Sequence, residues 1–154
     1  MSQFAQSWSL SRGLFLQALD GLDDAQLNWR LHPKALTIGE MALHVAGVEA
    51  FFMRQLIECS FTEVQDRVAQ SATDGVVNDR PFPFVPSEVT PAFVHETLKW
   101  SKSLVEPFIT SPSPDLLGKE LVSALGPVIT GEGALARFAF HPAYHHGQAH
   151  QIQT

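Results

Sequence analysis

The sequence predicts an all-α protein in which four long amphipathic helices pack as a four-helix bundle. Two observations favour this fold class. Apolar residues recur every three to four positions in four long segments, and no segment shows a convincing strand pattern. A length of 154 residues fits a single domain, residues 1–154, that is large enough for a hydrophobic core.

Composition narrows the class of protein. Hydrophobic residues make up 45% and charged residues 17%, which is typical of a folded globular chain. The net charge is −6 and the ten Lys and Arg residues form no cluster, so we expect no nucleic-acid partner. No apolar run approaches the roughly 20 residues of a membrane span, so we expect no membrane insertion.

The expected location is the cytoplasm. The N-terminal residues lack a basic stretch followed by a continuous apolar core, so we expect no signal peptide. The only cysteine, Cys59, cannot form an intramolecular disulfide, and this suits a reducing compartment.

The first helix is predicted over residues 2–22, where one apolar stripe repeats at helical spacing. Gly21 is expected to end it as the residue after the C-cap. A connector follows, in which Asp23 or Asp24 could cap one short turn.

The second helix is predicted from Thr37 to about Glu58. Thr37 and Glu40 form a capping-box pattern, in which each side chain bonds the backbone N–H of the other residue. The apolar pattern then fails over residues 62–89, where we expect a long connection with extended pieces. Such a crossover lets the second and third helices run parallel, which predicts an up-down-down-up topology.

The third helix is predicted to begin at Thr90-Pro91, with threonine as the cap and proline in the first turn. Pro107 is expected to bend or end it. Residues 111–115 resemble a loop, and residues 119–130 fit either a short extended piece or irregular structure. The fourth helix is expected to start between Thr130 and Gly133.

The fourth helix carries four of the seven histidines, as two pairs spaced four residues apart: His141 with His145, and His146 with His150. On a helix this spacing places both rings of a pair on one face, where they can converge on a single ion. Neutral imidazole is the commonest protein ligand of transition metals. The sequence therefore predicts a metal site on this helix.

The position of the apolar face on the fourth helix distinguishes the two histidine pairs. Its inner face is marked by Leu135, Phe138 and Ile152. His141 and His145 share that face, whereas His146 and His150 lie about 100° around the helix and are expected to be solvated or interfacial.

A third ligand is expected from the second helix, where His44 lies along the edge of the apolar face. His32 lies in a connector and His95 on a less apolar face, so neither is favoured. Three neutral imidazoles suit Zn²⁺, Ni²⁺ or Fe²⁺ and leave a coordination position for water or substrate, as in catalytic sites.

Three further residues are candidates for supporting roles. Gln148 lies three positions after His145 and could orient a ligand or ordinary polar neighbours. Glu40 lies four positions before His44 and could accept its N–H, although capping is its more natural role. Tyr144 could line a pocket beside the motif, or pack in the core or at its rim.

Three motifs in order along the chain resemble the DinB/YfiT-like superfamily of small metal-binding four-helix bundles. They are LDGLDDAQLNWR at 19–30, TIGEMALH at 37–44, and the His-x-x-x-His-x-Gly-Gln pattern at 141–148. The resemblance implies a divalent metal held by His44, His141 and His145. The family often has Arg after the second of these last two histidines, where this chain has His146.

The resemblance implies an activity of the hydrolase or thiol S-transferase type, acting on a small molecule and, for a transferase, on a low-molecular-weight thiol. The alternative is a non-catalytic metal-binding or stress-response bundle, which the lack of an evident acid or base partner favours. Homodimerisation is a further expectation, because exposed aromatic side chains would need cover: Phe51, Phe61, Phe82 and Phe84.

Overall fold

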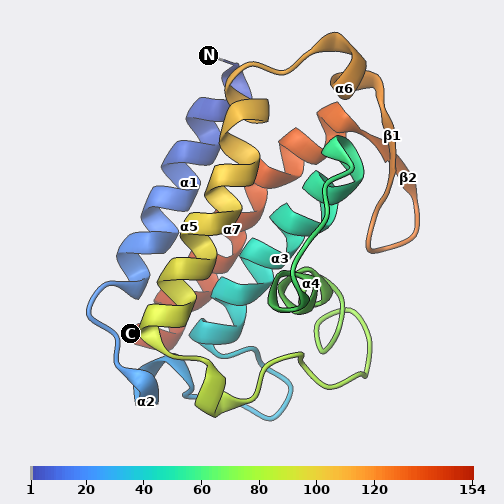
Figure 1. The fold of residues 1–154 in the computed structure, drawn as a ribbon. Coiled ribbons are helices and arrows are strands. Elements are labelled where there is room, and N and C mark those ends of the chain that lie inside the picture. Colours follow the sequence, from blue (N-terminus) through green and yellow to red (C-terminus); the bar gives the residue numbers. More distant parts are fainter. Residues whose placement is uncertain (1) are drawn as a thin grey trace.

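Four long helices account for most of the chain: α1 (Gln3–Leu19), α3 (Ile38–Ile57), α5 (Pro91–Thr110) and α7 (Gly131–Gln153). The structure is a computed structural model and describes residues 2–154. The four helices lie side by side (Figure 1), and the all-α prediction is confirmed. None of the helices in the described part of the chain is both long and apolar enough to cross a membrane.

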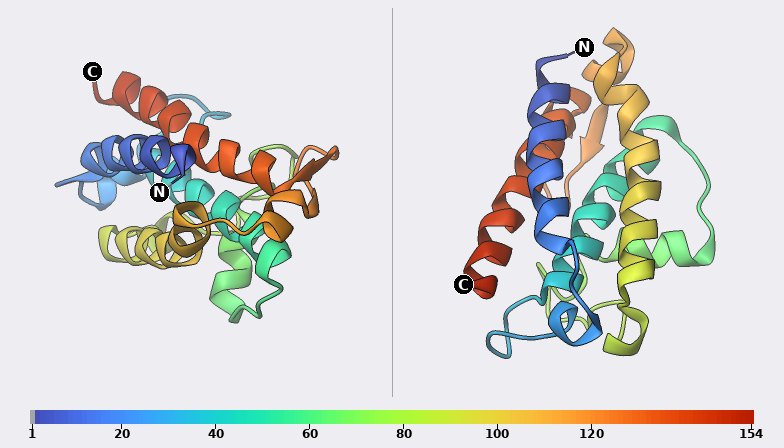
Figure 2. Two further views of the ribbon diagram at one scale, coloured as in Figure 1. Left: turned by 90° about the horizontal axis from the view of Figure 1, so that it is seen from above. Right: turned by 90° about the vertical axis from the view of Figure 1, so that its left-hand side faces the viewer.

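Helix α1 lies between α5 and α7 in both views of Figure 2, and it contacts both of them. Helix α3 packs against α5 and α7 as well. In Figure 1, α3 and α5 run in one direction while α1 and α7 run in the other. Helix α7, which carries four of the histidines, therefore runs antiparallel to α3.

Three of the long helices begin at threonine N-caps, at the starts that the sequence predicts. The Thr37 hydroxyl accepts from the Glu40 amide while the Glu40 carboxylate accepts from the Thr37 amide, so the predicted capping box is confirmed. Thr90 and Thr130 cap α5 and α7 in the same position. Gly21 follows the end of α1 with φ +74°, a conformation that favours glycine.

The predicted connection over residues 62–89 is partly wrong, because it contains helix α4 (Glu63–Gln70) and the short 3₁₀ helix η1 (Pro86–Glu88), and no strand. The signal for α4 is a further capping box: the Thr62 hydroxyl accepts from the Gln65 backbone N–H, and the Gln65 side-chain oxygen accepts from the Thr62 backbone N–H. Helix α4 packs against α3. This contact brings its C-terminal end close to the middle of α3.

Three small elements complete the fold. Helix α2 (Asp24–Leu27) is capped by Asp23, one of the two residues predicted for that turn. The predicted loop at 111–115 instead enters helix α6 (Pro114–Gly118). Residues 119–130 contain an antiparallel hairpin of β1 (Glu120–Val122) and β2 (Val128–Thr130), the extended alternative for that stretch. Pro107 lies within α5, which continues to Thr110.

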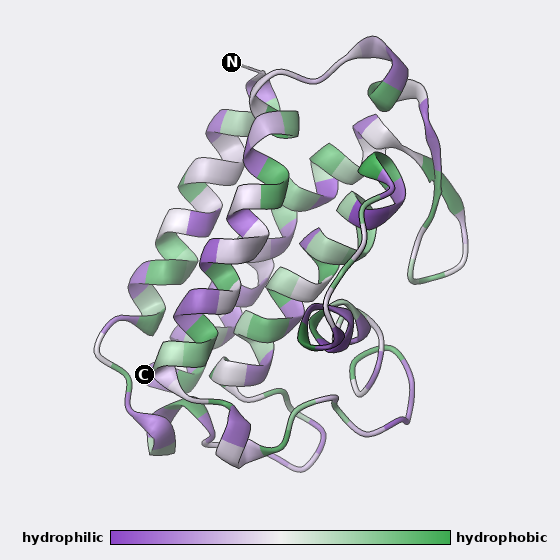
Figure 3. Cartoon of the chain, in the orientation of Figure 1, coloured by the Kyte–Doolittle hydropathy of each residue, from purple (hydrophilic) through white to green (hydrophobic). Residues whose placement is uncertain are grey.

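Apolar and polar residues are interspersed along the long helices (Figure 3). Helix α3 is the most deeply buried of them, since every residue from Ile38 to Gly47 is buried. The interior has two apolar clusters, one around Phe15, Leu43 and Leu98 and one around Trp8, Phe52 and Phe138. Both clusters join residues from at least three of the long helices, so the core forms only when the helices assemble.

The aromatic residues expected to be exposed are largely covered by the chain itself. Phe84 is buried, with 4% of its surface exposed, and Phe82 packs beside it. Phe51 packs against the second apolar cluster, and the Phe61 ring lies 5.3 Å from that of Trp100. The expectation that these rings need a partner subunit is therefore wrong, and homodimerisation stays a prediction without this support.

Candidate metal centre

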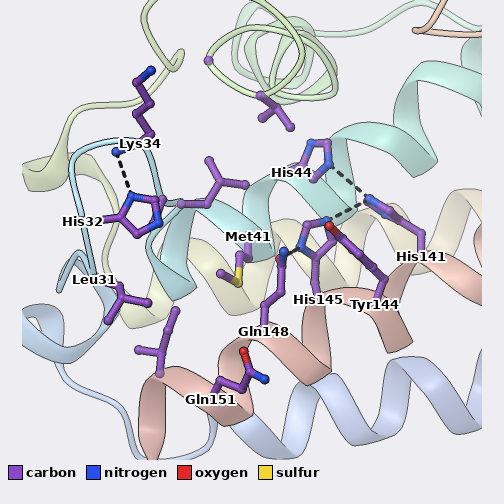
Figure 4. Close-up of a pocket in the computed structure, with 15 residues that line it drawn as sticks. Leu31, His32, Lys34, Met41, His44, His141, Tyr144, His145, Gln148 and Gln151 are labelled. Atoms are coloured by element: carbon purple, nitrogen blue, oxygen red, sulfur yellow. Dashed lines mark hydrogen bonds between the residues drawn. The ribbon is translucent and has the colours of Figure 1, made fainter.

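The three histidines that the sequence singles out lie together in the fold. Helix α3 supplies His44, and α7 supplies His141 and His145 (Figure 4). The Nε2 atom of His141 lies 3.1 Å from Nε2 of His44 and 3.0 Å from Nε2 of His145. The facing nitrogens of all three rings lie within 4.8 Å of one another. The packing of α3 against α7 therefore creates one cluster from residues almost 100 positions apart.

The cluster is largely shielded from water. His44 and His145 are buried, with 5% and 4% of their surfaces exposed, and His141 is half-buried. The other two histidines of α7 lie apart from it: His146 is half-buried and His150 is exposed, and their rings are tilted towards each other with centroids 6.5 Å apart. They take no part in the three-histidine cluster.

The outer nitrogens of two rings are fixed by oxygen acceptors. The His44 Nδ1–H donates to the backbone carbonyl of Ser71 at 2.7 Å, and the His145 Nδ1–H donates to Oε1 of Gln148 at 2.8 Å. A carbonyl oxygen can only accept, so each Nδ1 carries the proton of its neutral ring. The Nε2 atoms of His44 and His145 therefore present lone pairs to the centre of the cluster, which is the tautomer that binds a metal through Nε2.

Proton counting shows why a cation fits this arrangement. Nε2 of His141 contacts two lone pairs, but a neutral ring has at most one proton on that atom. One close nitrogen–nitrogen contact is therefore left without a proton. A positive ion held among the three nitrogens would satisfy every lone pair, and a three-histidine donor set suits a borderline divalent metal. The cluster is compatible with metal binding.

Burial keeps the cluster unprotonated. Loss of hydration lowers the pKa of His141 to about 2, and repulsion from the other two imidazoles adds to the effect. The same loss of hydration, with repulsion from His44, lowers the pKa of His145 to about 4. Burial also lowers the pKa of His44, against the opposing hydrogen bond to Ser71. All three rings are therefore neutral at physiological pH, as metal ligands must be.

We expect the metal-free protein to lose stability in mild acid because of these histidines. In the unfolded chain each ring has its ordinary pKa of about 6.5, so below that pH the unfolded chain binds protons that the folded chain does not. Stability is fully present above pH 6.5 and falls towards pH 4, by at most about 1.4 kcal/mol per pH unit for each histidine. Chemical unfolding at a series of pH values measures this slope. His145→Gln should flatten it, and parallel profiles would contradict the assignment.

The fixed position of Ser71 depends on a close approach between α4 and α3. Ser71 caps the end of α4, and its hydroxyl donates to the Leu43 carbonyl at 2.8 Å. A Cβ atom at Gly47 would lie 2.4 Å from both Ser71 Oγ and the Val68 carbonyl oxygen, so only glycine allows this contact. The sequence carries no local signal for Ser71, because its role depends on a helix that the periodicity did not predict.

Of the three residues predicted to support the histidines, two lie beside the cluster and one does not. Gln148 contacts His145 directly. The Glu40 carboxylate accepts from the Arg30 guanidinium at 2.6 and 2.9 Å and from the Thr37 backbone N–H. These bonds direct it away from His44, whose Nδ1–H donates to Ser71 instead. Tyr144 is half-exposed, and its ring centroid lies 5.0 Å from that of His145.

Two pockets meet at the cluster. The first, of about 440 Å³, is shown in Figure 4 and is lined by all three histidines together with Met41, Tyr144 and Gln148. His32 and Lys34 lie at its other end. The second, of about 320 Å³, is lined by His44 and His141 but not by His145. Both volumes fall in the range of roughly 300–1,000 Å³ that is usual for small-molecule sites.

We expect Gln148→Ala to weaken metal binding by about 10–100-fold, the usual effect of removing an acceptor behind a ligating histidine. The substitution leaves His145 Nδ1 without its acceptor, so the ring loses both its orientation and its fixed tautomer. Competition with a chelating dye measures the affinity. Gln151→Ala is the matched control, because Gln151 lines the same pocket and is exposed. Equal affinities for the two variants would contradict this role for Gln148.

Comparison with known proteins agrees with the fold. No curated protein matches the sequence. Among solved structures, a conserved protein from Enterococcus faecalis superposes with a TM-score of 0.69 and 14% identity, covering 97% of this chain and 92% of its own. At that identity the likeness shows the fold alone. The sequence matches the DinB superfamily over residues 7–149, nearly its whole length, and the chain belongs to that superfamily.

Proposed function

We propose that the chain is a divalent-metal-dependent thiol S-transferase built on an up-down-down-up four-helix bundle, with His44, His141 and His145 as the metal ligands. The observation that carries the proposal is the convergence of three Nε2 atoms at one point, with two of the rings oriented by oxygen acceptors. Zinc, nickel and iron(II) all suit three imidazoles. A bound metal of this kind would lower the pKa of a coordinated thiol or water towards neutrality.

The chemistry of the pockets favours thiol transfer over hydrolysis. Metal-dependent hydrolases of the H-E-x-x-H type use a glutamate as general base beside the metal. Neither pocket has an acidic side chain among its lining residues in the described part of the chain. A thiol needs less help than water, because its ordinary pKa is already near 8.5. Transfer would then form a carbon–sulfur bond to an electrophilic carbon while the leaving group departs with its electron pair.

The residues of the chain would bind, orient and exclude water in this proposal. The 440 Å³ pocket reaches from the histidines to His32 and Lys34, and it would admit the thiol along a partly polar path. Gln148 and the Ser71 carbonyl would hold the two rings in their ligating tautomer. Burial of His44 and His145 would keep competing water from the centre.

Metal analysis followed by thiol titration tests the proposal. Untagged protein purified from cells grown with supplemental zinc, nickel or iron should carry about one equivalent of metal per chain, measured by elemental analysis. Cysteine and glutathione, titrated by calorimetry, should bind the metal-loaded protein and not the metal-stripped protein. Binding to the Co²⁺-substituted protein should produce thiolate-to-cobalt absorption. Protein without stoichiometric metal would contradict the metal site, and metal without thiol binding would support the non-catalytic alternative.

A further inference from the structure

The smaller of the two pockets has walls that are almost entirely apolar. Helix α3, helix α7, the turn of the β1–β2 hairpin and the segment after α4 enclose it, and its apolar lining includes Val48, Phe51, Phe52, Val77, Leu125 and Phe140. Three of these side chains are unusually exposed for their type: Val77 at 47%, Leu125 at 74% and Phe140 at 64%. Exposed apolar side chains gathered around one pocket are typical of a binding site.

One charged side chain, Arg137, lines this pocket among the residues that the structure describes. The other five arginines of the chain each lie within 4 Å of a carboxylate: Arg12, Arg30, Arg54, Arg67 and Arg80. Arg137 has no such partner within residues 2–154, and its guanidinium donates only a long hydrogen bond of 3.4 Å, to the Gly133 carbonyl of its own helix. A half-buried guanidinium beside apolar walls is thus left with most of its donors free.

The position of Arg137 relates it to the metal site. It lies one helical turn before His141 on α7, and both side chains line the same pocket. A molecule bound to the guanidinium through one end would therefore lie along the apolar walls with its other end towards His44 and His141. The chain carries a net charge of −6, which disfavours anions near most of its surface. Within this pocket, the guanidinium of Arg137 is the group that favours an anion.

We propose that this apolar pocket binds a small carboxylic acid with an aliphatic or aromatic body, whose carboxylate pairs with Arg137 and whose far end meets the three-histidine site. A guanidinium matches a carboxylate in charge and in its paired oxygens. A phosphate dianion carries more charge than this single cation can balance. That such an acid would be the acceptor in thiol transfer rests on the proposed function, whereas its binding to Arg137 does not.

Binding of 4-phenylbutyrate and of its neutral primary amide to the full chain tests the proposal. Metal-stripped protein is used first, because a carboxylate could otherwise bind a metal directly. Calorimetry should show that the acid binds more tightly than the amide. Arg137→Gln should weaken acid binding by about tenfold or more and leave amide binding unchanged, as expected for loss of a charge-assisted pair. The affinity of Arg137→Lys for the acid should fall between those of the wild type and Arg137→Gln.

The matched control is Arg80→Gln, since Arg80 is exposed and lies away from the pocket. Thermal unfolding of each variant establishes that it is folded, and the acid–amide comparison in wild type needs no variant at all. Equal binding of acid and amide, or acid binding that Arg137→Gln leaves unchanged, would overturn the proposal. Arg137-dependent binding by a chain that, as purified after growth with supplemental metal, carries no stoichiometric metal would support this inference while contradicting the proposed function.

Discussion

His141→Ala is expected to abolish stoichiometric metal binding. The His141 Nε2 atom lies between those of the other two rings, at 3.1 and 3.0 Å, so its loss leaves two ligands that no longer enclose a common point. If the roughly 10–16 kcal/mol of a four-ligand zinc site is shared equally among the ligands, each accounts for about 2.5–4 kcal/mol. Loss of one ligand then lowers the affinity by about 10²–10³-fold. Elemental analysis and chelator competition measure both the content and the affinity.

A second readout separates loss of metal from loss of fold. A ligand at about 100 times its dissociation constant stabilises the folded state by about 2.7 kcal/mol, so zinc should raise the unfolding midpoint of the wild-type protein. The same addition should leave His141→Ala unchanged. His150→Ala is the control on the same helix, because His150 is exposed and lies outside the cluster, and it should respond as the wild type does. Equal zinc responses from all three proteins would exclude His141 as a ligand.

Glu49→Ala is expected to be one of the most destabilising single substitutions in the core. Glu49 and Arg12 are 2% and 3% exposed, and Arg12 Nε donates to Glu49 Oε1 at 3.1 Å. The same oxygen accepts from Trp8 Nε1 at 3.1 Å, and the guanidinium also donates to Ser101 Oγ at 3.0 Å. Removing the carboxylate leaves a buried guanidinium uncompensated, so the free energy of unfolding should fall by about 3–5 kcal/mol. Denaturant titration of the metal-free protein measures it.

Two controls isolate the buried charge as the cause. Glu106→Ala breaks the half-exposed pair with Lys102, whose atoms are 3.9 Å apart, and should change stability by less than about 0.5 kcal/mol. The double variant Arg12→Met, Glu49→Leu removes both charges and should recover a large part of the loss, because no unpaired ion remains. A cost at Glu49 no larger than that at Glu106 would show that the ion pair does not hold α1 to α3.

This ion pair also shows where reasoning from periodicity stops. Arg12 and Glu49 occupy helical positions that any solvated face could carry, and nothing nearby in the sequence distinguishes them. Their burial depends on the assembly of α1, α3 and α5, which are far apart along the chain. The same reason explains why only one of the two acceptors behind the histidines was predicted from the sequence. Gln148 lies one turn from His145, whereas Ser71 lies 27 positions from His44.

Local sequence patterns were enough to predict the all-α class, the helix starts at Thr37 and Thr90, a fourth helix that starts between Thr130 and Gly133, and the inner face that His141 and His145 share. These follow from capping chemistry and a 3.6-residue repeat, which act over one or two turns. Tertiary packing decided the rest. It brought His44 to the pair on α7, gave Ser71 and not Glu40 the role behind it, and lowered the histidine pKa values by burial. It also placed Arg137 beside a second pocket, because burial and long-range contacts depend on the assembled fold and leave no local pattern.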